Sequence, residues 1–223
     1  RPAPNAFTSL IEACAEVGRV DKAFDVHGFM KRVGVRPAAT TYTALIDCCA
    51  RARALERAMA VLQEMLHIGE QPDVNCFNMV IHICGEVGKV DFAFQMLDYM
   101  VSLQLPPNSH TFADLIETCL RAGDLRRALQ VLYEMKSAGW APSAATQDAV
   151  LVGCARSSEP LTSLVQLIEQ QRVDGRALPP MTAVELIKAL AGSCRHADAV
   201  ELFGLLQIEQ HATALSGQVL AEA

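Results

Sequence analysis

The sequence predicts an all-α protein, an α-solenoid of stacked helix-turn-helix hairpins, and three observations support this fold class. A pattern of 35 residues returns without slipping through four successive copies. Each copy contains two stretches in which apolar residues have helical spacing, and no stretch shows the alternation of a half-buried strand. A repeat period of roughly 20–50 residues is typical of arrays of supersecondary units. Because one hairpin cannot bury its apolar face alone, we expect neighbouring copies to share a continuous core.

The register follows from marker residues that return every 35 positions. Each copy has an aromatic residue three positions ahead of an aliphatic pair, and later an alanine, a methionine and a proline. The aromatic markers are Phe7, Tyr42, Phe77 and Phe112, the alanines Ala23, Ala58, Ala93 and Ala128, the methionines Met30, Met65, Met100 and Met135, and the prolines Pro37, Pro72, Pro107 and Pro142.

Six copies follow from this register. Four regular copies occupy residues 4–38, 39–73, 74–108 and 109–143, a degraded copy occupies 144–179, and a sixth copy occupies 180–214. We interpret residues 1–214 as one elongated domain and residues 215–223 as the start of a further helix. The chain starts at Arg1, without a methionine and close to the first copy, so we expect it to be a fragment of a longer protein.

Each copy encodes two helices with recognisable ends. In the second copy, Tyr42, Leu45, Ile46 and Cys49 mark the apolar face of the first helix, and Leu55, Ala58, Met59, Leu62 and Met65 mark that of the second. Glycines are predicted to form the hairpin turn (Gly18, Gly88, Gly123) and to end the second helix (Gly34, Gly69, Gly139). Asp73, Asn108 and Ser143 are predicted N-caps of the helices that follow them.

Composition and charge limit the classes of function. The net charge is −6, which argues against a protein that coats polyanions without specificity. No uncharged apolar run reaches the ~18 residues of a membrane span, so we expect no membrane partner. Five cysteines recur in register and are interpreted as small packing residues, with no metal site and no cofactor: Cys14, Cys49, Cys84, Cys119 and Cys154. No arrangement of nucleophile, base and orienting group is present, so we expect no enzyme activity.

The markers of the second copy resemble a known family. The stretch Thr41–Ile46, the helix from Ala58 to Met65, Gly69 and the closing Pro72-Asp73 resemble the pentatricopeptide repeat family, and the uniform length resembles its plain 35-residue (P-type) class. The resemblance implies binding of single-stranded RNA in mitochondria or chloroplasts, one base per repeat. It further implies a role in RNA processing, stability or translation, with the RNA on the surface of the first helices.

The resemblance also implies which side chains read the bases. In the family, one reading residue directly follows the aromatic residue, and the other is the last residue of the repeat. Thr43 with Asp73 resembles a guanine-reading pair, and Asn78 with Asn108 resembles a pyrimidine-reading pair. Thr8 with Ala38 and Ala113 with Ser143 match no strong combination, so Thr8, Ala113 and Ser143 are weaker candidates.

Two further sets of positions depart from the family pattern. The second position of each repeat, where the family places an aliphatic residue beside the base, holds Asn5, Thr40, Asn75, His110, Ala145 and Met181. A groove-side position where the family often has lysine holds Glu16, Arg51, Glu86, Arg121 and Arg156. The arginines Arg51, Arg121 and Arg156 are therefore candidates for contacts with the RNA backbone.

Two questions stay open at the level of sequence. Asp73, Asn108 and Ser143 are suited to capping alone or to capping together with base contact, whereas Thr43 and Asn78 are expected on an exposed first turn without a packing role. The alternative function is a scaffold subunit of an organellar ribonucleoprotein, such as a mitochondrial ribosome, that contacts rRNA with little base-specific reading. Protein partners are expected near the degraded C-terminal repeats.

Overall fold

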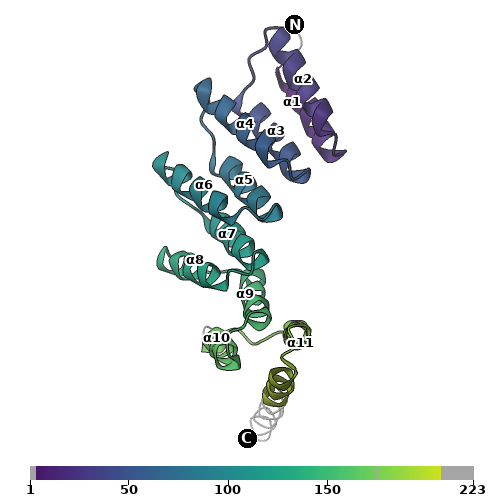
Figure 1. The fold of residues 1–223 in the computed structure, drawn as a ribbon. Coiled ribbons are helices and arrows are strands. Elements are labelled where there is room, and N and C mark those ends of the chain that lie inside the picture. The colour runs from purple at the N-terminus through teal and green to yellow at the C-terminus, as the bar shows by residue number, and fades with distance from the viewer. Residues whose placement is uncertain (1–3, 174, 207–223) are drawn as a thin grey trace, which may run out of the picture. The chain divides into compact units, whose positions relative to one another are not determined.

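The computed structural model describes residues 4–173 and 175–206, and in these ranges the chain is helical without strands. The helices follow the predicted hairpins in order (Figure 1). They are α1 (Pro4–Glu16), α2 (Val20–Arg32), α3 (Ala39–Arg51), α4 (Leu55–His67), α5 (Val74–Glu86), α6 (Val90–Ser102), α7 (Ser109–Arg121), α8 (Leu125–Ser137), α9 (Ala144–Arg156), α10 (Leu161–Val173) and α11 (Pro180–Gly192). Residues 196–206 are also helical, and the predicted start of a helix at 215–223 lies outside the described residues, as do 207–214 of the sixth copy.

Packing between the helices confirms the predicted α-solenoid of stacked hairpins. The two helices of each repeat pack on each other, as α1 does on α2 and α3 on α4. The first helices of successive repeats also pack on each other, so α3 lies between α1 and α5, and α5 lies between α3 and α7. In the first four repeats, the second helix of a repeat contacts the first helix of the next. The first helices α1, α3, α5 and α7 therefore form one continuous layer, and side chains from consecutive repeats meet within it.

The chain divides into two compact units, residues 1–142 and 143–223. The boundary lies one residue before the junction between the fourth regular copy and the degraded fifth copy. The first unit contains α1 to α8, and the second contains α9 to α11 and the helical residues 196–206. The organisation of 1–214 as a single domain stays a prediction, and the candidate RNA-reading pairs Thr43–Asp73 and Asn78–Asn108 belong to the first unit.

The repeated apolar markers form the core. Tyr42 and Phe77 are almost fully buried, and the marker alanines and methionines have at most 1% exposure. An alanine at this place allows the paired helices to approach closely, and a methionine fills the space at the end of the hairpin. The in-register cysteines Cys49, Cys84 and Cys119 are buried and free. Burial raises the pKa of the Cys84 and Cys119 thiols to about 11, so they pack as neutral groups.

The hairpin turns have one backbone geometry in every regular copy. Gly18, Gly88 and Gly123 have φ between 70° and 75°, as predicted for left-handed helix ends. The following N–H closes the turn on the carbonyl of the in-register cysteine, for example Lys89 N on Cys84 O at 2.8 Å. Arg53 adopts the same conformation (φ 54°) in the copy without a turn glycine. The repeat therefore imposes the turn even where the residue type does not favour it.

Ion pairs join the second helices of two pairs of repeats. Arg57 Nη1 of α4 lies 2.7 Å from Asp21 Oδ1 of α2, and the guanidinium lies over the Phe24 ring. Arg127 Nη1 of α8 lies 2.6 Å from Asp91 Oδ1 of α6 in the same arrangement. Its guanidinium lies over the Phe94 ring. These two clamps link the first repeat to the second and the third to the fourth.

Candidate nucleic-acid interface

The layer of first helices contains a groove of about 570 Å³ between α3, α5 and α7. Seven of its nine lining residues have polar or charged side chains, and one of them is Asn78, a predicted base-contacting residue. The other lining residues are Asp47, Ala50, Arg51, Asn75, Met79, His82, His110 and Asp114. The groove therefore lies on the surface where the resemblance placed RNA.

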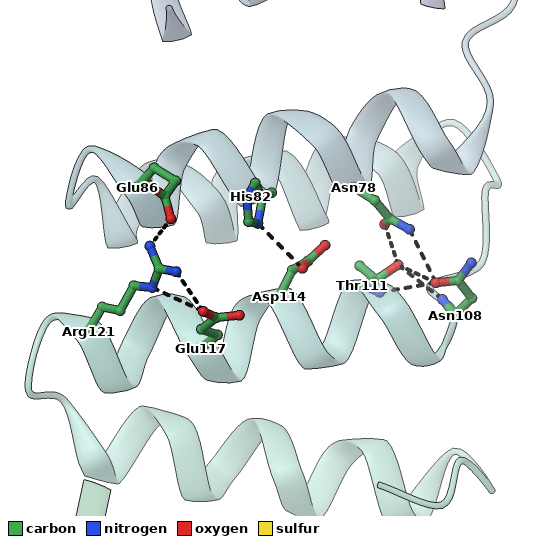
Figure 2. A network of polar contacts seen from close by, with 8 residues as sticks. All are labelled: Asn78, His82, Glu86, Asn108, Thr111, Asp114, Glu117 and Arg121. Atoms are coloured by element: carbon green, nitrogen blue, oxygen red, sulfur yellow. Dashed lines mark hydrogen bonds and ion pairs between the residues drawn. The ribbon is translucent and has the colours of Figure 1, made fainter. Parts of the chain in front are cut away.

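Asn78, Thr111 and Asn108 form a closed hydrogen-bond network between α5 and the start of α7 (Figure 2). Asn78 Nδ2 donates to Asn108 Oδ1 at 3.3 Å, and the Thr111 hydroxyl donates to Asn78 Oδ1 at 2.7 Å. Asn108 Oδ1 also accepts from the Thr111 backbone N–H at 3.0 Å, and the Asn108 N–H donates to Thr111 Oγ1 at 3.1 Å. The second pair of contacts is a capping box at the start of α7.

Capping fixes the orientation of both amide groups. The unpaired backbone N–H groups of the first turn of α7 require an acceptor, so Asn108 must direct its oxygen towards Thr111. Asn78 can then pair with that oxygen only through its NH₂ group, which leaves its own oxygen for the Thr111 hydroxyl. The NH₂ groups of both side chains retain hydrogens beyond these contacts. The pair is thus a set of donors whose oxygens are already engaged.

Thr43 and Asp73 have a similar arrangement one repeat earlier. Asp73 caps α5, because its Oδ1 accepts from the Cys76 N–H at 2.8 Å. The Thr43 hydroxyl donates to Ala39 O at 3.1 Å and lies 3.4 Å from Cys76 Sγ. Burial raises the pKa of the Cys76 thiol to about 11, and a hydrogen bond to the Asp73 side chain acts in the same direction. Cys76 therefore contacts both members of this candidate pair.

The structure corrects one expectation and confirms another. Asn78 is buried (8% exposed) and Thr43 is half-buried, so neither lies on a free, exposed turn. The reason is that the first helix of the following repeat packs directly against each of these residues. The helical periodicity within one copy does not reveal this contact. The capping roles of Asp73, Asn108 and Ser143 are confirmed, since each side chain accepts from a backbone N–H of the following helix.

The weaker candidates from the sequence have different settings. Thr8 is half-buried, and its hydroxyl lies 2.9 Å from that of Thr41. Ala113 is half-buried in α7 and has no hydrogen-bonding group on its side chain. Ser143 is exposed, caps α9, and lies 2.9 Å from the Thr146 hydroxyl. Base contact by any of these residues stays a prediction.

The candidate backbone-contacting arginines differ in how far carboxylates neutralise them. Arg51 Nε lies 2.9 Å from Asp47 Oδ2 of its own helix. Arg121 pairs with Glu117 at 2.6 Å and with Glu86 of the preceding repeat (Figure 2). Arg156 is exposed and lines a separate groove of about 690 Å³ between α9 and α11, together with Lys188 and Glu185.

Three lining residues were missed as site residues by the reasoning from sequence. His82 Nδ1 lies 3.8 Å from Asp114 Oδ1, and His110 lines the same groove. Burial raises the pKa of Asp114 to about 6, while the nearby His82 acts in the opposite direction. The spacing between His82 and Asp114 is a signal in the sequence that could have identified them. Residues 32–33 positions apart face each other across adjacent first helices, as Asn78 and Thr111 do.

No helix in residues 4–173 and 175–206 is both long enough and apolar enough to cross a membrane. The same ranges contain no group of three or more His, Cys, Asp or Glu side chains suited to hold a metal ion.

Stacked helical hairpins with polar residues along the first-helix layer define a helical-repeat protein. A family model described as "Pentatricopeptide repeat-containing protein" matches residues 76–206, which is more than half of the chain. Models for "PPR repeat family" and "Pentatricopeptide repeat domain" match residues 5–51 and 30–87. The chain therefore belongs to the pentatricopeptide repeat family. A comparison with curated proteins gave no match.

Solved structures of similar fold include proteins in complex with RNA. The pentatricopeptide repeat protein PPR10 in complex with an 18-nt psaJ RNA element has a TM-score of 0.66 and 25% identity over 93% of this chain. PPR10 from maize gives a TM-score of 0.72 at 22% identity, again over 93% of this chain. This chain covers 28% and 30% of the PPR10 chains, less than a third of their length.

A third solved structure, of a different protein, has a similar fold. The pentatricopeptide repeat domain of Arabidopsis thaliana protein-only RNase P 1, in complex with tRNA, gives a TM-score of 0.70 at 19% identity. The match covers 86% of this chain and 100% of that domain. At this identity the match shows a common fold and nothing about the ligand of this chain.

Proposed function

We propose that this protein binds single-stranded RNA along the layer formed by α3, α5 and α7, and that the array reads a guanine followed by a pyrimidine. Thr43 with Asp73 contacts the guanine, and Asn78 with Asn108 contacts the pyrimidine. The observation that carries the proposal is that Asn78 lines the groove between the first helices while it hydrogen-bonds Asn108. The complex of PPR10 with an RNA element is consistent with this class of ligand.

The groove also offers a surface for base stacking. His110 occupies the second position of its repeat, lines the groove and is exposed. An imidazole ring can stack on an unpaired base, and such stacking contributes ~1–3 kcal/mol per base. Asn75, at the same position of the preceding repeat, lines the other part of the groove. The absence of the usual aliphatic residue is therefore partly compensated at this one step.

We further propose that the protein acts in a mitochondrion or chloroplast, in the processing, stability or translation of a transcript. This part rests on the family resemblance. This chain spans less than a third of the length of PPR10.

Selection from a random pool of single-stranded RNA on residues 1–223 tests the proposed reading. We expect enrichment of a guanine–pyrimidine step, and loss of that enrichment in the double variant Asp73→Ala, Asn108→Ala. Because both side chains cap helices, each substitution also lowers stability by ~1 kcal/mol. Asp124→Ala is a matched control, since Asp124 caps α8 through the Arg127 N–H at 3.0 Å and belongs to a second helix.

The control separates reading from folding. The Asp124→Ala variant should melt earlier while it enriches the same step as the wild type. A double variant that enriches the guanine–pyrimidine step as strongly as the wild type would contradict the proposed reading. Failure of the folded wild-type protein to enrich any sequence would contradict it as well.

A scaffold role in an organellar ribonucleoprotein is the second candidate function, and the charge pairing favours it. Arg51 and Arg121 are held by carboxylates, which limits their contacts with phosphate. Large apolar side chains are also exposed in the second unit, namely Val173, Met181, Val184, Val200, Phe203 and Leu205. Binding of RNA without base preference, together with a stable protein partner held by this surface, would support the scaffold role over sequence reading.

A further inference from the structure

In the second, third and fourth repeats, the residue directly before the aromatic marker is buried against the preceding repeat. Thr41, Cys76 and Thr111 hold this position and have 0% exposure. Each contacts the residue that follows the aromatic marker one repeat earlier, at a spacing of 33 residues. The contacts are Thr41 Oγ1 with Thr8 Oγ1 at 2.9 Å, Cys76 Sγ with Thr43 Oγ1 at 3.4 Å, and Thr111 Oγ1 with Asn78 Oδ1 at 2.7 Å.

At two of these three junctions the buried residue also contacts the N-cap that ends the preceding repeat. Thr111 Oγ1 lies 3.1 Å from both the backbone nitrogen and the Oδ1 of Asn108. The Cys76 backbone N–H donates to Asp73 Oδ1 at 2.8 Å. At the first junction the cap position is Ala38, whose methyl group cannot take part. The complete three-residue arrangement therefore occurs at the two pairs proposed to read bases.

We infer that Thr111 and Cys76 are positioning residues for base recognition in the repeat that precedes each of them. Thr111 holds the amide groups of Asn78 and Asn108 in one orientation, and Cys76 holds Thr43 and Asp73. The inference rests on the proposed RNA binding. It means that the two side chains that read one base belong to one repeat, and that a third, buried residue of the next repeat positions them without touching the RNA.

The physical basis is the symmetry of the amide group. An Asn side chain has similar shape in its two orientations, but rotation by 180° exchanges the donor and the acceptor. Thr111 donates to the oxygen of Asn78, so it favours the orientation in which the NH₂ group pairs with Asn108. Without that hydroxyl the oxygen of Asn78 loses a partner inside a buried contact, and the favoured orientation is weakened.

The two positioning residues differ in the strength of their hydrogen bonds. A thiol is a weak donor and a weak acceptor, whereas a hydroxyl is strong in both roles. The Cys76 contact with Thr43 is also longer than the Thr111 contact with Asn78, at 3.4 Å against 2.7 Å. The side chains proposed to contact the guanine are therefore positioned less firmly than those proposed to contact the pyrimidine. We expect Cys76→Thr to increase the preference for guanine over other bases.

The test compares Thr111→Val, Thr111→Ser and the wild type on short single-stranded RNAs that differ only at the pyrimidine step. Valine keeps the shape of threonine and removes the hydroxyl, while serine keeps the hydroxyl. We expect Thr111→Val to reduce the ratio of affinities for pyrimidine over purine by about three- to tenfold, the range of one net hydrogen bond. Thr111→Ser should restore the ratio, and the preference at the guanine step should be unchanged in both variants.

Folding is controlled by melting followed through helical circular dichroism. If Thr111→Val fails to fold, Thr111→Cys replaces it, because the fold already accommodates a buried cysteine at the same position in the preceding repeat. For Thr111→Cys, the ratio of affinities for pyrimidine over purine should lie between the wild-type ratio and the ratio expected when the hydroxyl is absent.

The outcomes distinguish this inference from the proposed function. A wild type that prefers pyrimidine, together with a Thr111→Val or Thr111→Cys variant of equal preference, would overturn the positioning role and leave RNA reading intact. A wild type that binds RNA without any preference at this step would overturn the inference and leave RNA binding in place. A folded wild type without RNA affinity would overturn the proposed function itself and the inference with it.

Discussion

Two groups of polar side chains between α5 and α7 are held by contacts with one another, and a carboxyl that lies between them is in an unfavourable state. Asn78, Thr111 and Asn108 satisfy one another, and Arg121 satisfies Glu86 and Glu117. Asp114 lies between these two clusters with His82 at 3.8 Å, a distance too long for a strong hydrogen bond (Figure 2). Ionisation of this half-buried carboxyl therefore opposes folding.

Asp114→Asn should stabilise the protein at neutral pH. The pKa of Asp114 rises from an ordinary value of 3.8 to about 6 on folding, mainly because of burial. Between these values the folded chain binds more protons than the unfolded chain, so this carboxyl lowers the free energy of unfolding as the pH rises. We expect the stability advantage of Asp114→Asn to grow by about 1–2 kcal/mol between pH 4 and pH 7.5, which allows for partial exposure.

Urea unfolding of both proteins across this pH range measures the effect. The groups that face Asp114 are His82, His110 and Glu117, and their substitution would complicate the comparison, so they are left unchanged. A constant difference in the free energy of unfolding between the two proteins from pH 4 to pH 7.5 would show that folding does not raise the pKa of Asp114.

At the scale of helices, the approach of α5 to α7 depends on a glycine inside a helix. Gly85 is buried in α5, and a Cβ atom placed there would collide with the hydroxyl of Thr118 in α7. It would also lie 3.3 Å from the Thr118 Cβ. Close packing here brings α5 and α7 together near their C-terminal ends, which carry Glu86 and Arg121.

Gly85→Ala should destabilise the protein by about 1–2 kcal/mol, because overpacking of a core contact costs more than the helix propensity of alanine returns. Gly28→Ala is the matched control. Gly28 lies in the interior of α2, where a Cβ would meet Arg32 Nη1 at an ordinary 3.6 Å. That variant should gain roughly 0.5–1 kcal/mol. Thermal melting of both variants decides the matter, and a stabilised Gly85→Ala would disprove the close contact.

The helices and their caps were largely predictable from sequence, and the contacts between repeats were not. Periodicity within a copy places Tyr42 in the core and Asp73 at an N-cap, and the structure confirms both. Burial of Asn78 depends on the next copy packing over it, which no local pattern encodes. Similarly, Arg53 adopts a left-handed turn because its repeat neighbours require one, although its residue type argues against it.

Over the whole first unit, charge is arranged so that cations on the first-helix layer are compensated. Glu86 is the centre of this compensation, because Arg53 Nη2 lies 2.6 Å from one carboxylate oxygen and Arg121 pairs with the other. Its side chain is only 10% exposed. With a net charge of −6, the protein should therefore bind RNA with a shallow dependence on salt concentration.

Glu86→Gln should strengthen RNA binding and steepen its salt dependence. Removal of the central carboxylate frees Arg53 for phosphate and leaves Arg121 paired with Glu117 alone. Each new phosphate contact adds about 0.7 to the slope of log affinity against log salt for a single strand. Glu56→Gln, an exposed residue in the first turn of α4, changes net charge equally and serves as control. Equal slopes for the two variants would show that total charge, rather than local release of arginine, governs binding.

The clamps between second helices have a consequence for how the array comes apart. Asp21 with Arg57 joins repeats one and two, and Asp91 with Arg127 joins three and four, while the equivalent positions between repeats two and three hold Glu56 and Phe92. In a one-dimensional array, opening begins at the weakest junction between neighbours. Amide hydrogen exchange should therefore show that repeats one and two open together, and that repeats three and four open together. The junction between these two pairs lies within the groove proposed to hold RNA. A bound strand would therefore couple the two pairs, and they would open as one unit.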